Sequence, residues 1–202
     1  MMMKPTALRY AHEKNLFNTP YYAWVDFGSS HVVRNHADIC SKVLENPGPR
    51  VKVCYIHYRG KEELSSVERF LSGEGPCGIA GTIYTVEAAY VNRFYCVMFS
   101  IFYEMIAKGV GHTDEQIMTY CYDRYPHLFT LYYGDYYSIL TNYFASHQDL
   151  NTIHWCFIER ARAVGRNDLA ADAAQSILRA ATEGLVLSED QVCMYKHIAG
   201  LV

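Results

Sequence analysis

The chain has 202 residues, 50% of them hydrophobic and 19% charged, and its formal net charge is -3 at pH 7. This composition excludes an intrinsically disordered chain, and the balance of charges argues against binding to nucleic acid or to an anionic membrane. The seven cysteines form no CxxC pair, which argues against a zinc cluster and a secreted disulfide framework and favours a reducing compartment, the cytoplasm.

The first part of the chain predicts alternating helices and strands. Residues 6–16 are typical of a short helix that Pro20 ends, because the residue before a proline avoids the α region. Residues 21–27 are almost continuously apolar, so we expect a strand that is buried on both faces at the centre of a sheet. A short helix over 38–44 precedes a strand over 51–58, whose side chains alternate between two faces.

The middle of the chain continues this pattern. We expect a helix over 65–71, a strand over 79–84, a helix over 86–108, a helix from Thr113 to Pro126 and a strand over 129–133. Gly109 follows the longest helix as a C-terminal cap, and Thr113 and Gln116 form a capping box. No apolar run is long enough for a transmembrane helix.

From residue 150 onward the pattern is purely helical. Three helices are expected over 150–164, 168–183 and 189–201, with glycine-containing turns between them. The sequence therefore predicts an α/β domain over residues 1–148 and a helical C-terminal extension over residues 149–202.

Asp26 is the first candidate for chemistry, because it stands where an apolar strand runs into the turn at Gly28. In open α/β sheets, ligands bind at the carboxyl ends of strands, and a carboxylate there can hold a divalent cation that bridges nucleotide phosphates. Gly28 would let the backbone approach that ligand. An aspartate in such a turn is equally suited to capping the backbone, so both interpretations stay open.

Two further candidates are Asp114 and Glu115, which begin a predicted helix. Acidic residues in a first turn complement the helix dipole, and this structural role is the more economical interpretation. Adjacent carboxylates at a helix start also suit a general base that removes a proton from a hydroxyl. Asp135, which follows Gly134, is suited to a turn or to the lining of the same pocket.

Aromatic residues suggest what such a pocket would bind. The chain has 18 tyrosines, several of them in adjacent pairs such as Tyr136-Tyr137. They fit half-buried strands and helix flanks, and they equally fit an aromatic pocket for sugars or other ring-shaped ligands.

Four segments in order along the chain resemble the HtrL/YibB family. They are Asn18 to Gly28, Ile79 to Tyr84, Thr113 to Ile117 and Tyr133 to Tyr136. The family is similar to nucleotide-sugar glycosyltransferases of the GT-A type and includes bacterial proteins linked to surface polysaccharide. The resemblance implies an α/β fold, a partial GT-A-like three-layer sheet with a C-terminal helical tail. It also implies that the nucleobase-binding part that usually opens a GT-A domain does not precede Asp26.

The resemblance further implies roles for single residues on the donor side. Asp26 matches the first aspartate of a metal-binding Asp-x-Asp motif, and Gly28 stands in the place of the second. Lys4, at the start of the similar region, belongs to the same donor site. The implied cofactor is Mn²⁺ or Mg²⁺, held by Asp26.

On the acceptor side, the resemblance places Gly81, Thr82 and Asp135, with Asp114 or Glu115 as the catalytic base. We therefore expect a glycosyltransferase that moves a sugar from a nucleotide-sugar donor to a hydroxyl of a glycan acceptor, in glycan or surface polysaccharide synthesis. The alternative is a non-catalytic, degenerate relative that binds a ligand or serves as a scaffold. The sequence leaves the oligomeric state open.

Overall fold

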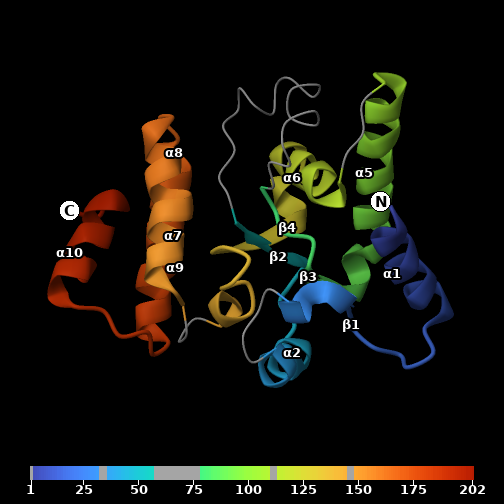
Figure 1. Ribbon diagram of the computed structural model, residues 1–202, viewed down its shortest axis with the longest axis horizontal. Helices are drawn as coiled ribbons and strands as arrows, with labels where there is room; N and C mark the ends of the chain where they lie inside the picture. The colour runs from blue at the N-terminus through green and yellow to red at the C-terminus, as the bar shows by residue number, and fades with distance from the viewer. Residues whose placement is uncertain (1, 32–35, 57–77, 110–112, 145–147) are drawn as a thin grey trace.

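The computed structural model describes residues 2–31, 36–56, 78–109, 113–144 and 148–202, and shows a mixed α/β fold (Figure 1). Its sheet has four strands in the order β1-β3-β2-β4. They are β1 (Tyr21–Val25), β2 (Val51–Tyr55), β3 (Ile83–Glu87) and β4 (Phe129–Tyr133).

The strand directions define one functional edge of the sheet. β3 runs antiparallel to β1 and β2, and β2 runs parallel to β4. The strands β1, β2 and β4 therefore end at the edge where β3 begins, which we call the carboxyl edge. In sheets of this kind, the loops at such an edge are the usual place for a ligand.

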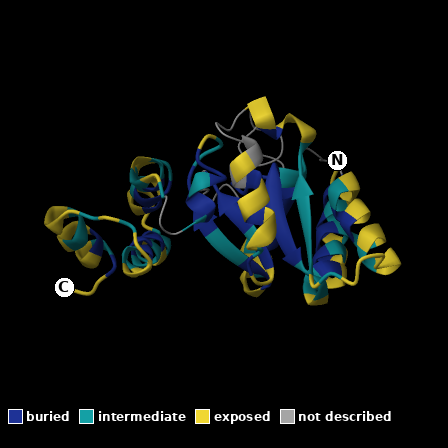
Figure 2. Cartoon of the chain, turned by 90° about the horizontal axis from the view of Figure 1, so that it is seen from below, coloured by how far each residue is buried: buried dark blue, intermediate teal, exposed yellow. Residues whose placement is uncertain are grey.

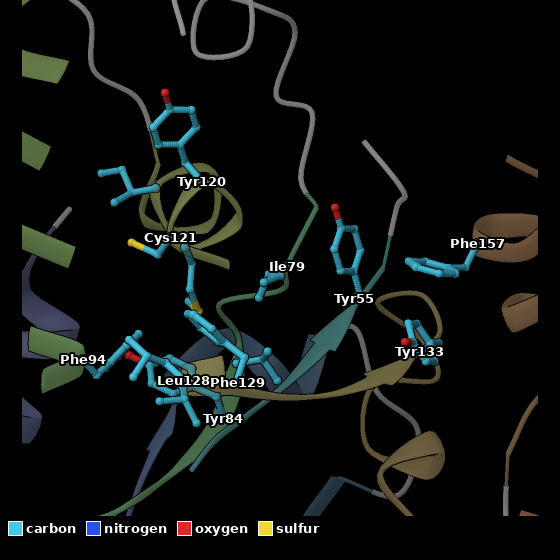
Figure 3. Close-up of a cluster of buried hydrophobic side chains, with 14 of the residues drawn as sticks. Tyr55, Ile79, Tyr84, Phe94, Tyr120, Cys121, Leu128, Phe129, Tyr133 and Phe157 are labelled. Atoms are coloured by element: carbon cyan, nitrogen blue, oxygen red, sulfur yellow. The ribbon is translucent and has the colours of Figure 1, made fainter. Parts of the chain in front are cut away.

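One face of the sheet packs against α1 (Met3–Lys14), α5 (Ala88–Ala107) and α6 (Asp114–Arg124). Every second residue of β2, such as Val51 and Val53, points to this face and is fully buried. Figure 3 shows the resulting cluster, in which Phe94 from α5 lies against Tyr84 and Phe129 of the sheet. Apolar alternation in the strands and the apolar stripe of α5 meet here and form the main core.

The opposite face carries a smaller core. Cys54 and Ile56 project to this side and pack with Val43 of α2 (His36–Glu45). Tyr143, in the short helix η3 (Thr141–Tyr143), completes this cover. The fold thus has three layers, with helices on both sides of the sheet (Figure 2).

The C-terminal helices continue the main core at the β4 end of the sheet (Figures 1 and 2). They are α7 (Leu150–Ile153), the π-helical segment η5 (His154–Ile158), α8 (Glu159–Ala163), α9 (Asn167–Thr182) and α10 (Glu189–Ile198). The ring of Phe157 lies 5.1 Å from that of Tyr55 and 4.4 Å from that of Tyr133, centroid to centroid. The Tyr133 hydroxyl donates a hydrogen bond of 2.6 Å to Asp172 of α9. The division of the chain at residue 148 stays a prediction.

Most of the expected elements are confirmed, and two expectations are wrong. Among the described residues β1 pairs only with β3, so it lies at an edge of the sheet, and its five residues are all half-buried. Its tyrosines and tryptophan are amphipathic, which makes a partly exposed edge strand compatible with an apolar sequence. The third strand begins at Ile83 instead of Ile79, and Ile79 forms only an isolated bridge to Tyr55.

Two further observations concern the limits of the helices. Gly109 has a φ of +73°, as expected for a C-terminal cap after α5. The expected helix over 65–71 lies outside the described residues. Within the described part of the chain, no helix combines the length and the apolar character that a membrane span requires.

Candidate functional site

Most of the residues selected from the sequence meet at the carboxyl edge, although they come from four separate segments. Asp26 directly follows β1, and the loop before β3 supplies Gly81 and Thr82. Helix α6 begins with two acidic residues, and α1 contributes a lysine. The residues brought together are Lys4, Asp26, Gly81, Thr82, Asp114 and Glu115.

Lys4 is at the centre of this group. Its Nζ lies 3.0 Å from Asp26 Oδ2, 2.9 Å from Asp114 Oδ2 and 3.0 Å from the carbonyl oxygen of Gly81, to which it donates a hydrogen bond. Only 15% of the Lys4 side chain is exposed, and 14% of Asp114. One ammonium group therefore ties α1 to β1, to the loop before β3 and to α6.

Asp26 is held at both carboxylate oxygens. The indole Nε1 of Trp24 donates a hydrogen bond of 2.6 Å to Oδ1, while Oδ2 faces Lys4. Trp24 and Asp26 reach the same side because side chains two residues apart in an extended segment point to the same face. The backbone is fixed as well, since Asp26 N donates to Thr82 O at 2.8 Å and Asp26 O accepts from Ser29 N at 3.0 Å.

The side chains of Lys4, Asp114 and Glu115 all approach Gly81 closely. Its N–H donates to Glu115 Oε1 at 2.8 Å, and its carbonyl accepts from Lys4. A Cβ at this position would lie 2.8 Å from Asp114 Oδ2 and 3.0 Å from Glu115 Cγ, so any other residue would require these side chains to shift. Because side chains take both backbone groups of Gly81, this residue interrupts the backbone pairing ahead of β3, which begins at Ile83.

An open pocket of about 530 Å³ lies beside Asp26. Its walls carry a carboxylate, hydroxyl groups and aromatic rings; the lining residues are Asp26, Phe27, Gly28, Ser29, Thr82, Tyr136 and Tyr137. We call it the edge pocket. Phe27 is fully exposed and Tyr137 is 75% exposed. The size and the mixture of rings and polar groups suit a small polar ring-shaped ligand.

A hydrogen bond connects Glu115 to Tyr136, one of the residues that line the edge pocket. The Tyr136 hydroxyl donates a hydrogen bond of 2.7 Å to Glu115 Oε2, so this glutamate bridges Tyr136 and the Gly81 N–H. Tyr136 lines the pocket, whereas the carboxylates of Asp114 and Glu115 stand behind its wall. A proton leaving a ligand hydroxyl thus has a route to Glu115 across one tyrosine.

Burial and pairing alter the protonation of two groups. Burial alone would lower the pKa of Lys4, but its contacts with Asp114 and Asp26 outweigh burial and raise that pKa above its ordinary value. Burial raises the pKa of Asp114, and the attraction of Lys4 offsets this only in part. Lys4 therefore keeps its positive charge throughout the physiological pH range.

Asp135 and Gly28 occupy plainer positions. Asp135 Oδ1 accepts hydrogen bonds from Ser138 N at 2.8 Å and Ser138 Oγ at 2.9 Å, which closes the turn after β4. This turn directs the neighbouring Tyr136 into the pocket wall. Gly28 lies in the 3₁₀ helix η1 (Phe27–His31), where a Cβ would have only His31 Cδ2 nearby, at 4.0 Å.

The metal expected at Asp26 does not fit the arrangement of the described residues. Both oxygens of Asp26 face donors of the protein itself, Trp24 and Lys4. The Lys4 ammonium also stands between Asp26 and Asp114, which is the position a shared cation would take. Within the described part of the chain, no three His, Cys, Asp or Glu residues are grouped so that they could hold an ion.

Several residues of the site were not selected as candidates from the sequence. Trp24 was detectable, because it precedes Asp26 by two residues and shares its face of the strand. Tyr136 and Tyr137 were named from the sequence only as one of several tyrosine pairs that fit an aromatic pocket, without a place in this site. Ser29 and Phe27 carry no such signal.

The family comparison agrees with the segments recognised in the sequence. A family model described as "Bacterial protein of unknown function (HtrL_YibB)" matches residues 2–146. No curated protein and no solved structure matches the chain.

Proposed function

Because this chain belongs to the HtrL_YibB family, whose function is unknown, we propose from its site that it is a glycosyltransferase. It would move a sugar from a nucleotide-sugar donor to a hydroxyl of a glycan acceptor. The observation that carries the proposal is the meeting of Lys4, Asp26, Gly81 and Glu115 at one sheet edge, beside a pocket. In this proposal the three-layer sheet is a partial GT-A-like domain, and its compartment is the cytoplasm.

The chemistry of the edge pocket supports a sugar as the ligand. Carboxylate and hydroxyl oxygens, such as those of Asp26 and Thr82, pair with the hydroxyl groups of a sugar. Exposed rings, such as those of Phe27 and Tyr137, offer an apolar face for the carbon side of a pyranose. A volume of about 530 Å³ accommodates a monosaccharide and part of a second group.

Glu115 is the better of the two base candidates. A general base must reach the proton it removes directly or through one intermediary. Tyr136 lines the pocket and donates to Glu115 Oε2, so the acceptor proton would pass to Glu115 through the Tyr136 oxygen. Asp114 instead faces Lys4 and serves to hold that ammonium in place.

A non-catalytic, sugar-binding relative is the second candidate, and one observation favours it. Among the described residues that line the edge pocket, none carries a positive charge, whereas a donor diphosphate is an anion. Lys4, which contacts the pocket residue Asp26, is itself neutralised by Asp26 and Asp114. A binding protein that recognises the sugar alone would need no further cation.

Ligand-dependent thermal unfolding separates these candidates. We expect UDP and UDP-sugars, tested with and without Mn²⁺, to raise the melting temperature by a degree or more, because a ligand selective for the folded state stabilises it. Asp26→Asn should abolish that rise, while Asp123→Asn, on the exposed side of α6, should keep it. If free sugars stabilise the chain and no nucleotide diphosphate does, the result supports the non-catalytic, sugar-binding relative.

Transfer itself is tested at Glu115. Glu115→Gln keeps an acceptor for the Gly81 N–H but removes the base, so we expect donor binding to persist while transfer falls by roughly 10²- to 10⁴-fold. Tyr136→Phe should reduce transfer in the same direction, because the proton route is cut. Unchanged transfer in both variants would exclude Glu115 as the base.

A further inference from the structure

We infer that the ammonium group of Lys4 is the resident cation of the carboxyl edge, filling an oxygen-lined site so that no divalent metal is bound at Asp26. Three oxygens surround Nζ at 2.9–3.0 Å: Oδ2 of Asp26, Oδ2 of Asp114 and the carbonyl oxygen of Gly81. Two carboxylates and a carbonyl are the ligand types that hard cations take from proteins. The lysine head thus stands where such an ion would be held.

The three oxygens are fixed independently of one another. Trp24 Nε1 holds Asp26 from its other oxygen, and Asp114 begins the 11-residue helix α6. Gly81 is fixed through its N–H, which donates to Glu115. The three oxygens therefore come from three structural elements, and Asp26 and Gly81 each have a further contact that does not involve Lys4.

Competition with a free metal ion favours the lysine. Lys4 is part of α1, whose Leu8 is buried in the main core and whose Arg9 lies over the ring of Tyr95 of α5 at 4.4 Å. A group tethered in this way has a high effective concentration at its site. A divalent ion would have to expel the ammonium from between two carboxylates, of which Asp114 is only 14% exposed and Asp26 is 33% exposed.

This inference has a consequence for the proposed function, but it can be correct even if the proposed function is wrong. If the site transfers sugar, the inference makes donor binding independent of divalent metal, and EDTA leaves it unchanged. If the chain binds no nucleotide, the cation site is still present. The test therefore uses Mn²⁺ alone, detected by electron paramagnetic resonance and by thermal unfolding, with no nucleotide.

The informative variant is Lys4→Met, which removes the charge and keeps much of the side-chain volume. We expect wild type to bind no Mn²⁺ at Asp26, whereas Lys4→Met binds it. At about a hundredfold excess over the dissociation constant, Mn²⁺ should raise the melting temperature of Lys4→Met by about 5 °C or more. Lys14→Met, which removes an exposed lysine of the same helix, should behave as wild type. The double variant Lys4→Met/Asp26→Asn should lose the acquired binding.

Three results would overturn the inference. One is Mn²⁺ binding by wild type that Asp26→Asn removes. Another is a folded Lys4→Met that binds no Mn²⁺. If Lys4→Met is unfolded in buffer, addition of Mn²⁺ becomes the readout: refolding by the ion supports the cation site, and failure to refold contradicts it.

Discussion

At the scale of single residues, Gly81 decides whether the carboxyl edge can assemble. Lys4, Asp114 and Glu115 approach it so closely that even a methyl group would force these side chains to move. The requirement is one of space, because Gly81 does not have the positive φ that usually demands glycine. Gly109 differs from Gly81 in both respects. Its positive φ ends a helix, and a Cβ built at Gly109 would have no atom within 4 Å.

A pair of glycine substitutions tests this requirement. In Gly81→Ala the new methyl group would lie 2.8 Å from Asp114 Oδ2, and we expect the free energy of unfolding to fall by about 1–3 kcal/mol. Gly28→Ala is the matched control, with a change within about 0.5 kcal/mol, because only a distant His31 atom is near. Urea unfolding of both variants measures the difference. Equal stabilities would show that Lys4 and the carboxylates give way freely.

Lys52 provides a second prediction at this scale. Its Nζ lies 3.5 Å from the centroid of the Tyr143 ring and donates to Tyr143 O at 3.3 Å. Burial lowers the pKa of Lys52 to about 8, and the attraction of Glu183 offsets burial only in part. In the unfolded chain the pKa is about 10.4, so between these values the unfolded state binds more protons. The contribution of Lys52 to stability therefore rises with pH across that window.

The measurement compares wild type with Lys52→Met by urea unfolding from about pH 7 to about pH 10. We expect wild type to gain stability relative to Lys52→Met as the pH rises through about 8, because the cost of burying the charge disappears. Titration of tyrosines that do not contact Lys52 is common to both proteins and cancels. The exposed Lys42→Met is the control and should show a constant difference from wild type. A constant difference for Lys52→Met as well would contradict the prediction.

At the scale of elements, α6 holds the loop before β3 in place. Thr119 Oγ1 accepts a hydrogen bond of 2.8 Å from Ile79 N and donates one of 2.9 Å to Glu115 O. Gly78 lets this contact form, since a Cβ there would lie 2.5 Å from Thr119 Cγ2. Two glycines and one threonine thus bring a helix against a loop that also makes backbone hydrogen bonds with Cys54 and Ile56.

Thr119→Val tests this attachment. The valine has nearly the same shape but leaves the buried N–H of Ile79 without its acceptor, so we expect a loss of about 1–3 kcal/mol of stability. Thr182→Val, at the exposed end of α9, removes a comparable hydroxyl and should change stability by less than about 0.5 kcal/mol. Chemical unfolding gives both values, and equal losses would mean that Thr119 contributes little beyond its volume.

Elements with strong local patterns were predictable from the sequence. The apolar spacing of α5 and the run of β4 are local properties, and both elements form where they were expected. β3 was misplaced because Ile79 and its neighbours have the composition of a strand, while side chains of α1 and α6 occupy the backbone of Gly81. Periodicity within one segment contains no information about such distant partners.

In the site as well, features set by the local sequence were predictable, and those set by contacts between distant segments were not. Asp26 and Glu115 were selected because a strand end and a helix start are recognisable places for functional carboxylates. Lys4 was assigned to the donor site, but its position between Asp26 and Asp114 depends on how α1 and α6 pack in three dimensions. For the same reason, the expectation of a metal at Asp26 took no account of a lysine head between Asp26 and Asp114.

At the scale of the whole molecule, the C-terminal helices and the sheet share one core. Phe157 is fully buried between Tyr55 and Tyr133. Its neighbour Trp155 points outward and is 66% exposed. A single core predicts that the two parts of the chain unfold together.

Phe157→Ala measures this coupling. Removal of the buried ring should cost about 3–5 kcal/mol, whereas Trp155→Ala, at an exposed site, should cost less than about 1 kcal/mol. In a Trp155→Phe background, the fluorescence of Trp24 reports on the sheet, and circular dichroism reports on all helices. We expect both signals to change at the same urea concentration. Separate transitions would show that the C-terminal helices fold on their own.

The contacts of Lys4 also determine when the site can form during synthesis of the chain. The lysine is made before its partners, because its carbonyl partner lies 77 residues further along the chain and its partner on α6 is more distant still. At about 5–20 residues per second, a ribosome needs roughly 5–20 s to deliver Asp114 after Lys4. The apolar side of α1, including Leu8, stays without its final partners during that interval. The carboxyl edge therefore cannot form until α6 has been made, and chaperones that shield α1 would act before then.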